Sequence, residues 1–472
     1  MSLSVMPGNG EMSFLVSRWI FLRALGLICL AAFISLWFQI KGLIGSSGIL
    51  PVNSYLQAVQ GSIGASRFWL CPTVFWFNGS DQALQVVCAL GTAAALALTV
   101  GVAPIPALIL IWILYLSLCV GGQDFMWFQW DVLLLETCFL AIFLAPPELW
   151  PGIGKESVVP TLARWLMWWL LFRLMFESGV VKLTSGDPNW RQLTALNYHY
   201  FTQPLPTWIG WYAQHLPAWF QRLSVVVTYI IEMGLPFLIF AGRPFRIVAC
   251  VGFVFLNVLI LLTGNYNFFN LLTIALSLFL LDDAVWHRLL PDVLWRAWGT
   301  GAVNHSPIGT LHVVLTVLVA VLFVGVGVLQ VWSCLMPRQP TVDRLENQLN
   351  VIRSFRSLNS YGLFRVMTTS RPEIVIEGSN DGRTWKAYEF KDKPGDPHRP
   401  PRFVEPHQPR LDWQMWFAAL NSFRNERWLQ YLLMRLFEGK PDVIGLLRVN
   451  PFPHDPPLSP NATLRIRIHL NS

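Results

Sequence analysis

Long apolar runs separated by short polar segments dominate residues 1–336 of the chain. Each run approaches the roughly 20 residues that an α-helix needs to cross a bilayer. The pattern therefore predicts a multi-pass α-helical membrane protein with about nine spans. The predicted spans are Trp19–Gln39, Ala83–Val102, Ile105–Val120, Phe125–Leu144, Arg164–Lys182, Leu223–Phe240, Phe245–Thr263, Phe268–Leu281 and Leu311–Trp332.

The pattern changes after residue 336, where short alternating runs replace the long apolar ones. EIVIEGS and RTWKAYEF flank Asn-Asp-Gly, which is a strong hairpin signal. Residues 413–437 have helical periodicity, and ATLRIRIHL near the carboxyl terminus alternates as a half-buried strand does. We expect residues 337–472 to form a β-rich, sandwich-like domain outside the membrane, with residues 1–336 as the membrane domain.

Charge at the first span predicts the orientation of the chain. Arg18 and Arg23 lie at the start of this span and favour a cytoplasmic amino terminus, because cytoplasmic ends of membrane helices are enriched in basic residues. An odd number of spans then places the carboxyl-terminal domain on the extracytoplasmic side.

Composition supports the membrane class and excludes others. The chain is 54% hydrophobic and 13% charged, with a mean hydropathy of +0.47. The net charge of +7 is spread along the sequence, which suits anionic lipid headgroups and gives no reason to expect a nucleic-acid partner. The seven cysteines contain no CxxC pair, so a thioredoxin-type role has no support.

Several ionisable residues fall inside the predicted spans. Arg173 and Glu177 are four residues apart and share a helix face, so they can neutralise each other. Lys182 follows at the exit of the same span, Glu136 lies in the preceding span as another candidate partner of Arg173, and Glu232 lies in the next one. Such residues either lock helix packing as ion pairs or line a pocket, and the sequence leaves both interpretations open.

Residues 184–222 form an unusual connection rich in tryptophan, tyrosine and proline. Aromatic side chains with polar tips suit the membrane–water boundary. We expect a folded cap that lies on the bilayer surface and closes over the helices. Its polar candidates for a substrate or client pocket are Asn197, His199, Tyr200 and His215.

Three asparagines, Asn265, Asn267 and Asn270, cluster at the start of the eighth predicted span. Amides at such a position can bind a ligand, and they equally satisfy broken backbone at a turn. Both interpretations stay open.

The search for catalytic motifs gives little. The chain has no GxSxG, HExxH, P-loop or dinucleotide-binding fingerprint, so we expect no cofactor and assign no catalytic residue. Glu136 and Asp131 point to different sides of their helix, which disfavours a carboxylate pair, and no metal site is expected.

Five stretches resemble the lipase maturation factor family. They are KGLIGSSGILP at Lys41–Pro51, FQWDVLLLETCFLAIFLAP at Phe128–Pro146, FRLMFESGVVKLTSGDPNW with LTALNYHYFTQPLP, TGNYNFFNLLTIALSLFLLDD at Thr263–Asp283, and VIGLLRVNPFP at Val443–Pro453. The resemblance implies a membrane-anchored factor of the secretory pathway that helps secreted lipases or other exported clients to fold. It places the carboxyl-terminal domain in the lumen of the endoplasmic reticulum, or in the periplasm if the protein belongs to a bacterial inner membrane; missing targeting and retention signals favour a bacterial-type member.

A more distant resemblance links the membrane region to the vitamin K-dependent carboxylase-like superfamily. It implies an alternative, an embedded enzyme or lipid-binding protein acting on a lipid-like substrate, with a bound lipid among the helices. Glu136, Arg173, Glu177, Lys182 and His199 would then line its pocket. Transport is a third class, but the sequence shows no inverted repeat to support it.

Overall fold

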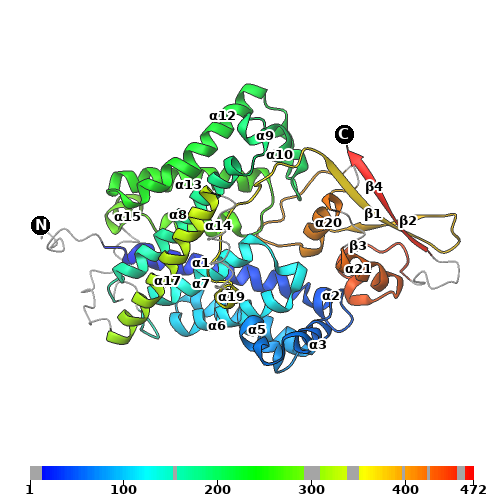
Figure 1. The fold of residues 1–472 in the computed structure, drawn as a ribbon, viewed down its shortest axis with the longest axis horizontal. Coiled ribbons are helices and arrows are strands. Elements are labelled where there is room, and N and C mark those ends of the chain that lie inside the picture. The colour runs from blue at the N-terminus through cyan, green and yellow to red at the C-terminus, as the bar shows by residue number, and fades with distance from the viewer. Residues whose placement is uncertain are drawn as a thin grey trace, which may run out of the picture.

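The computed structural model describes residues 13–151, 157–291, 309–336, 350–395, 399–421, 426–453 and 463–471. A helical bundle occupies one end of the molecule, and a small antiparallel sheet with its own helices occupies the other (Figure 1). The expected boundary between the two domains, at residues 336 and 337, adjoins a stretch outside the described residues. The helices of the bundle are α1 (Leu15–Trp37), α5 (Asp81–Val100), α6 (Pro104–Gly121), α7 (Gln129–Leu144), α8 (Thr161–Thr184), α12 (Ala218–Tyr229), α13 (Arg243–Thr263), α14 (Phe269–Leu278), α15 (Asp283–Leu289) and α17 (Thr310–Leu335).

Six helices in the described ranges are long and apolar enough to cross a membrane, and a seventh span is possible if one bent pair is counted. The six are Leu15–Trp37, Asp81–Val100, Pro104–Gly121, Ala218–Phe240, Arg243–Thr263 and Thr310–Leu335; the pair is α14 with α15, bent by 106°. A multi-pass helical membrane protein is therefore the observed class. The other two predicted spans correspond to α7, which has only 16 residues, and α8, which has 24 but carries buried charges.

Close helix contacts depend on small residues. A Cβ added at Gly26 on α1 would lie 2.7 Å from the backbone nitrogen of Thr99 on α5. One added at Gly327 on α17 would lie 2.6 Å from Nε1 of Trp169 on α8. Small residues at such positions let membrane helices approach closely, and the resulting dispersion contacts hold the bundle together.

The sixth predicted span, Leu223–Phe240, is broken in the middle. After α12 the chain passes through a π-turn, η4 (Ile230–Gly234), and a 3₁₀ segment, η5 (Leu235–Phe240). Pro236 lacks the backbone N–H that an α-helix requires, which explains why regular hydrogen bonding stops here.

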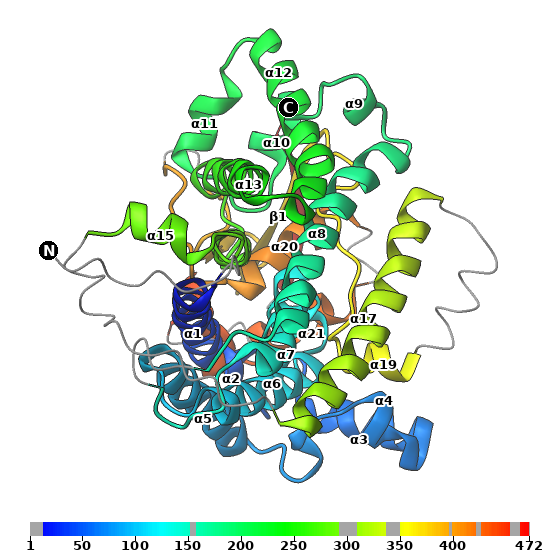
Figure 2. The same ribbon diagram turned by 90° about the vertical axis from the view of Figure 1, so that its left-hand side faces the viewer.

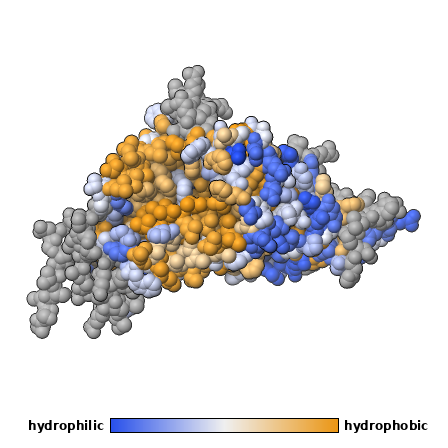
Figure 3. All heavy atoms as spheres, turned by 90° about the horizontal axis from the view of Figure 1, so that it is seen from below, coloured by the Kyte–Doolittle hydropathy of each residue, from blue (hydrophilic) through white to orange (hydrophobic). Residues whose placement is uncertain are grey.

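On the face of the molecule seen in Figure 3, apolar side chains cover the bundle, whereas the end with the sheet is hydrophilic. The outward faces of α13 and α17 expose many apolar side chains, as expected for surfaces that contact lipid tails instead of water. Their exposed residues include Phe245, Val248, Val251, Phe255, Leu311, Val314, Leu318 and Val321.

Short helices connect the spans at the end of the bundle nearest the sheet. They include α2 (Ile40–Ile44), α3 (Val52–Ile63), η1 (Gly64–Ser66), α4 (Arg67–Leu70), η2 (Val74–Trp76) and η3 (Gln123–Met126); a further short helix, α19 (Asn350–Ser354), follows α17 in the chain. The cap is formed by α9 (Pro188–Arg191), α10 (Leu196–Thr202), α11 (Trp208–Gln214) and the start of α12, which project together from one side of the bundle (Figure 2).

The carboxyl-terminal part contains a four-stranded antiparallel sheet in the order β3-β2-β1-β4. The strands are β1 (Arg371–Ser379), β2 (Lys386–Phe390), β3 (Leu447–Val449) and β4 (Thr463–Asn471). The predicted hairpin is confirmed, with Ile376 opposite Tyr388, and so is the predicted last strand, which pairs with β1 along its length.

The two layers of a sandwich are not the observed arrangement in the described residues. A single sheet packs instead with helices α20 (Arg410–Leu420), α21 (Arg427–Phe437) and α22 (Pro441–Ile444) nearby. The helical segment predicted at residues 413–437 thus forms two helices, and α20 supplies the apolar cover for β1 that a second sheet would have supplied.

Candidate functional site

Charged side chains from two helices converge beneath a segment of the carboxyl-terminal part. This segment, Ser357–Met367, is called the strap below. Arg173 on α8 forms an ion pair with Glu136 on α7, and both side chains are fully buried, as the sequence suggested for this pair. The second oxygen of Glu136 accepts hydrogen bonds from the Tyr361 hydroxyl at 2.7 Å and from two nitrogens of Asn359 at 3.1 Å. The strap thereby satisfies a carboxylate that would otherwise be costly inside the bundle.

Arg173 also contacts the last long helix. Its Nη1 donates to Oε1 of Gln330 on α17 and to the backbone oxygen of Asn359, both at 2.9 Å. One guanidinium group therefore connects α7, α8, α17 and the strap. Gln330 was missed from the sequence, although a lone amide in a strongly apolar span is a usable signal.

Glu177 does not hold the ion pair expected with Arg173. Its Oε2 accepts the backbone N–H of Tyr361 at 2.7 Å, and its Oε1 has no hydrogen-bond partner among the described residues. The shared helix face was correct as geometry, but the guanidinium group turns toward α7, where Glu136 approaches from a neighbouring helix.

Lys182 and Glu232 form a second buried pair. Lys182 Nζ lies 2.8 and 2.6 Å from the two oxygens of Glu232 and 2.9 Å from the backbone oxygen of Ser178. The ammonium group also lies 5.3 Å from the ring centroid of Trp190 in the cap. This pair fastens α8 to the broken helix η4 and satisfies both charges locally.

The four cap candidates do not meet in one pocket. His199 is partly buried, with its Nε2 3.3 Å from the Tyr266 hydroxyl, and it packs edge-on against Phe364 of the strap. Burial and the positive charge of Lys182 lower the pKa of His199 to about 4. Tyr200 packs against His199, and burial raises the pKa of its phenol to about 12.

The other two cap candidates lie at the margin. His215 is exposed and hydrogen-bonds through Nδ1 to the backbone oxygen of Trp211 at 2.7 Å. Asn197 is partly buried, and its backbone oxygen accepts a hydrogen bond from Gln214 at 2.6 Å. The contact at Asn197 joins α10 to α11, whereas the contact at His215 lies within the end of α11.

The asparagine cluster divides into two kinds. Asn265 connects domains: its side-chain nitrogen donates to the Arg402 backbone oxygen at 2.8 Å, and its oxygen accepts the Val404 N–H at 2.7 Å. Asn267 and Asn270 are fully buried, and neither side-chain polar atom of either residue has a partner among the described residues. Asn265 therefore has a structural role between the two domains. The side-chain amides of Asn267 and Asn270 are buried without hydrogen-bond partners among the described residues.

A third buried ion pair was not foreseen. Arg410 on α20 donates to both carboxylate oxygens of Asp131 on α7, at 2.9 Å each, and to the Phe125 backbone oxygen at 2.7 Å. The Tyr115 hydroxyl donates to the same carboxylate at 2.6 Å. The sequence did not reveal this pair, because nothing in a soluble-looking segment marks Arg410 as a partner for a membrane helix.

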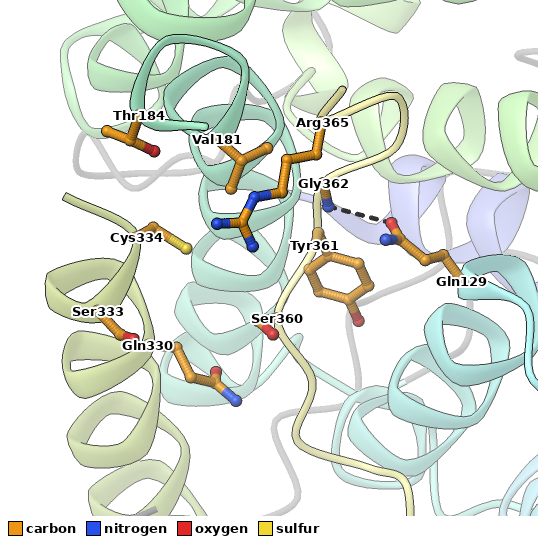
Figure 4. Close-up of a pocket in the computed structure, with 10 residues that line it drawn as sticks. All are labelled: Gln129, Val181, Thr184, Gln330, Ser333, Cys334, Ser360, Tyr361, Gly362 and Arg365. Atoms are coloured by element: carbon orange, nitrogen blue, oxygen red, sulfur yellow. Dashed lines mark hydrogen bonds between the residues drawn. The ribbon is translucent and has the colours of Figure 1, made fainter. Parts of the chain in front are cut away.

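A cavity of about 420 Å³ lies beside the strap, between α8 and α17 (Figure 4). Its lining residues are Gln129, Val181, Thr184, Gln330, Ser333, Cys334, Ser360, Tyr361, Gly362 and Arg365. Arg365 extends from the strap into the space between the two helices (Figure 4). Within the described ranges, no group of three or more His, Cys, Asp or Glu side chains could hold a metal ion.

The cap also exposes large aromatic side chains. Trp208, Trp211, Tyr212 and Trp219 are 48%, 57%, 63% and 66% exposed. Trp208 packs edge-on against Phe403 of the carboxyl-terminal part, with ring centroids 5.9 Å apart. The exposed aromatic surface is therefore continuous from the cap to the second domain.

These features define a polytopic membrane protein with an aromatic cap and a sheet domain, in which the buried Arg410–Asp131 ion pair joins the sheet domain to the helical bundle. Residues 16–288 match the family described as lipase maturation factor transmembrane domain, and residues 357–469 match lipase maturation factor C-terminal domain. The chain belongs to the lipase maturation factor family.

Curated relatives agree along nearly the whole chain. Lipase maturation factor 2 of Rattus norvegicus is 38% identical, over 94% of this chain and 78% of that protein. The Homo sapiens protein of the same name is 37% identical, over 93% and 77%. Lipase maturation factor 1 of Bos taurus is 34% identical, over 94% and 82%. No solved structure matches the chain.

Proposed function

We propose that this protein is a membrane-anchored maturation factor that assists secreted lipases or other exported clients to fold. The observation that carries the proposal is the similarity to proteins named lipase maturation factors, which extends through both domains and covers 94% of the chain. A role that needed the membrane domain alone would not require the second match at residues 357–469.

The proposal includes an orientation. All nine apolar segments are membrane-embedded, residues 1–336 are the membrane domain, and residues 337–472 work on the extracytoplasmic side. That side is the lumen of the endoplasmic reticulum in a eukaryotic source and the periplasm in a bacterial one. The start of α1 and the sheet lie at opposite ends of the molecule, which supports this arrangement (Figure 1).

The client-facing surface is the exposed aromatic surface around Trp208 and Phe403. These two side chains are 48% and 41% exposed, and they bridge the cap and the second domain. Rigid aromatic side chains bind partly folded apolar chain with little loss of conformational entropy, which makes such a surface suitable for a client.

The test is rescue of lipase secretion in cells that lack their own family members. Expression of this chain should raise the activity of a co-expressed secreted lipase, and Trp208→Ser with Phe403→Ser should lower that gain several-fold at equal protein level. Phe77→Ser is the matched control, since Phe77 is 89% exposed and lies away from this surface. Failure of the unchanged protein to raise the activity of any client lipase would reject the proposal.

A companion variant separates folding assistance from catalysis. Lys182→Met combined with Glu232→Leu removes both charges of one buried pair, so neither is left unpaired. A maturation factor should keep its rescue activity in this double variant. Complete loss at an unchanged melting temperature would favour an embedded enzyme.

A further inference from the structure

Polar residues with side chains that can donate hydrogen bonds form most of the lining of the cavity between α8 and α17. Gln330 Oε1 accepts from Arg173, and Gln129 Oε1 accepts the backbone N–H of Gly362 at 3.1 Å. A guanidinium group and a backbone N–H can only donate, so the oxygen of each amide is fixed toward its partner. The NH₂ group of each glutamine is consequently the end left for the cavity.

Other lining groups add donors and a positive charge. The guanidinium group of Arg365 and the hydroxyls of Ser333 and Ser360 make no hydrogen bond or ion pair with any described residue. Arg365 points into the cavity from the strap (Figure 4). The cavity thus combines one full positive charge with at least four unused donor groups.

The nearby carboxylates do not neutralise this charge. Glu136 is engaged by Arg173, Asn359 and Tyr361, and Glu177 accepts the backbone N–H of Tyr361. Neither glutamate lines the cavity. The carboxyl-terminal ends of α8 and α17 are near Thr184 and Cys334 and oppose an anion, but a helix-end charge is partial and decays within one turn, whereas Arg365 carries a full charge.

The position of the cavity suits the headgroup level of a bilayer. The last turns of α17 line part of the cavity. The outward residues Val324, Val328 and Trp332 of this helix are 43%, 50% and 48% exposed along the lipid-facing surface. A diacyl ligand could place its chains against this surface and its polar group in the cavity, since aromatic residues such as Trp332 favour the same depth.

We propose that this cavity binds a phosphoryl anion, with Arg365 as the charged contact and the Gln129, Gln330, Ser333 and Ser360 donors around it. Phosphate oxygens are acceptors only, and they match a donor-rich site with one arginine. The anion is the headgroup of a membrane phospholipid or a free phosphate. The inference goes beyond the maturation role and does not depend on any client.

The test uses the full chain in mild detergent and native mass spectrometry, which counts phospholipids that remain bound. The unchanged protein should retain phospholipid, and Arg365→Gln should reduce the retained fraction about tenfold, as expected for loss of one charge-assisted hydrogen bond. Ser333→Leu should have a similar effect by filling the cavity, while Arg365→Lys keeps the charge and most of the lipid. Arg191→Gln is the matched control, because Arg191 is exposed near the same end of α8 but does not line the cavity.

A second arm distinguishes the two sources. Delipidated protein is heated with inorganic phosphate and, at equal ionic strength, with chloride. Stabilisation by phosphate that Arg365→Gln abolishes, together with no retained lipid, assigns the site to free phosphate. The proposal is overturned if the unchanged protein retains no phospholipid and ignores phosphate, or if Arg365→Gln and Ser333→Leu behave like the unchanged protein.

Discussion

At the scale of single residues, the interior of this membrane protein is organised by charges that find partners far away in sequence. Asp131 and Glu136 lie five residues apart on α7, yet Arg410 of α20 satisfies the first and Arg173 of α8 the second. An ionised group in a low-dielectric interior is tolerated only with such a partner. Each pair therefore fixes one place where two elements must meet.

The Asp131–Arg410 pair gives the sharpest stability prediction. Arg410→Leu should destabilise the protein by about 3–5 kcal/mol, because it leaves the Asp131 carboxylate buried without a counter-charge. Thermal unfolding of the detergent-purified protein measures the effect. Asp131→Leu combined with Arg410→Met should recover much of the loss.

The control for this prediction is the exposed pair Lys41–Asp442, whose side chains are 42% and 36% exposed. Lys41→Ala should cost at most about 1 kcal/mol, since water screens such pairs. Equal losses of stability for Arg410→Leu and Lys41→Ala would show that the buried Arg410 pair contributes no more than an exposed pair.

Glu405 should make stability depend on pH. Burial raises its pKa to about 8, and one of its oxygens accepts the backbone N–H of Tyr266. The folded state therefore keeps the Glu405 carboxyl protonated at pH values where the unfolded chain, which releases this proton near about pH 4, does not. The contribution of Glu405 to folding stability is full below about pH 4 and is lost as the pH rises to about 8.

Between pH 6 and 8.5 this loss should amount to about 2 kcal/mol, since one pKa unit corresponds to about 1.4 kcal/mol. Glu405→Gln keeps an acceptor for Tyr266 but cannot ionise, so its melting temperature should fall less over the same range. Parallel curves for the two proteins would show that Glu405 does not titrate in this window.

At the scale of elements, the packing of helices through glycine can be tested directly. Gly26→Ala should destabilise the α1–α5 contact by about 1–3 kcal/mol, because the new Cβ would meet backbone atoms of Thr99 that cannot move alone. Gly325→Ala on α17 is the matched control, with no atom within 4 Å of its added Cβ. That change should be neutral or slightly stabilising in thermal unfolding; destabilisation of both variants to the same extent would argue against close α1–α5 packing.

Elements were predictable from the sequence where one local pattern determines them. The membrane spans follow from the length of the apolar runs, and the β1–β2 hairpin follows from its turn residues. The break at Pro236 follows from the backbone N–H that proline lacks. The strap was not predictable, because Ser357–Met367 has no periodicity and makes its contacts across about 200 residues of sequence. The same reason hid Arg410, whereas the Glu136–Arg173 pair could be proposed because both residues stand out in apolar spans.

At the scale of the whole molecule, the apolar surface of the bundle lies between the end that carries α15 and the hydrophilic end that carries the sheet (Figures 1 and 3). Asn380 is exposed in the hairpin turn, and Arg288 is exposed on α15 at the far end of the bundle. The molecule should therefore present these two residues on different sides of the membrane.

Single-cysteine labelling in sealed vesicles checks this arrangement. A membrane-impermeant maleimide should label Asn380→Cys and Arg288→Cys from opposite sides, with the unchanged protein as the background, since six of its seven cysteines are buried. Labelling of both positions from one side would exclude the proposed orientation.

The strap has a consequence for biosynthesis. Asp131 and Glu136 leave the ribosome long before Tyr361 and Arg410, which complete their coordination. Until the last quarter of the chain has been translated, α7 carries carboxyl groups whose full set of partners does not yet exist. Final assembly of the lipid-embedded half must therefore wait for the strap and α20, and a chain that stops before residue 357 has a bundle whose interior is incomplete.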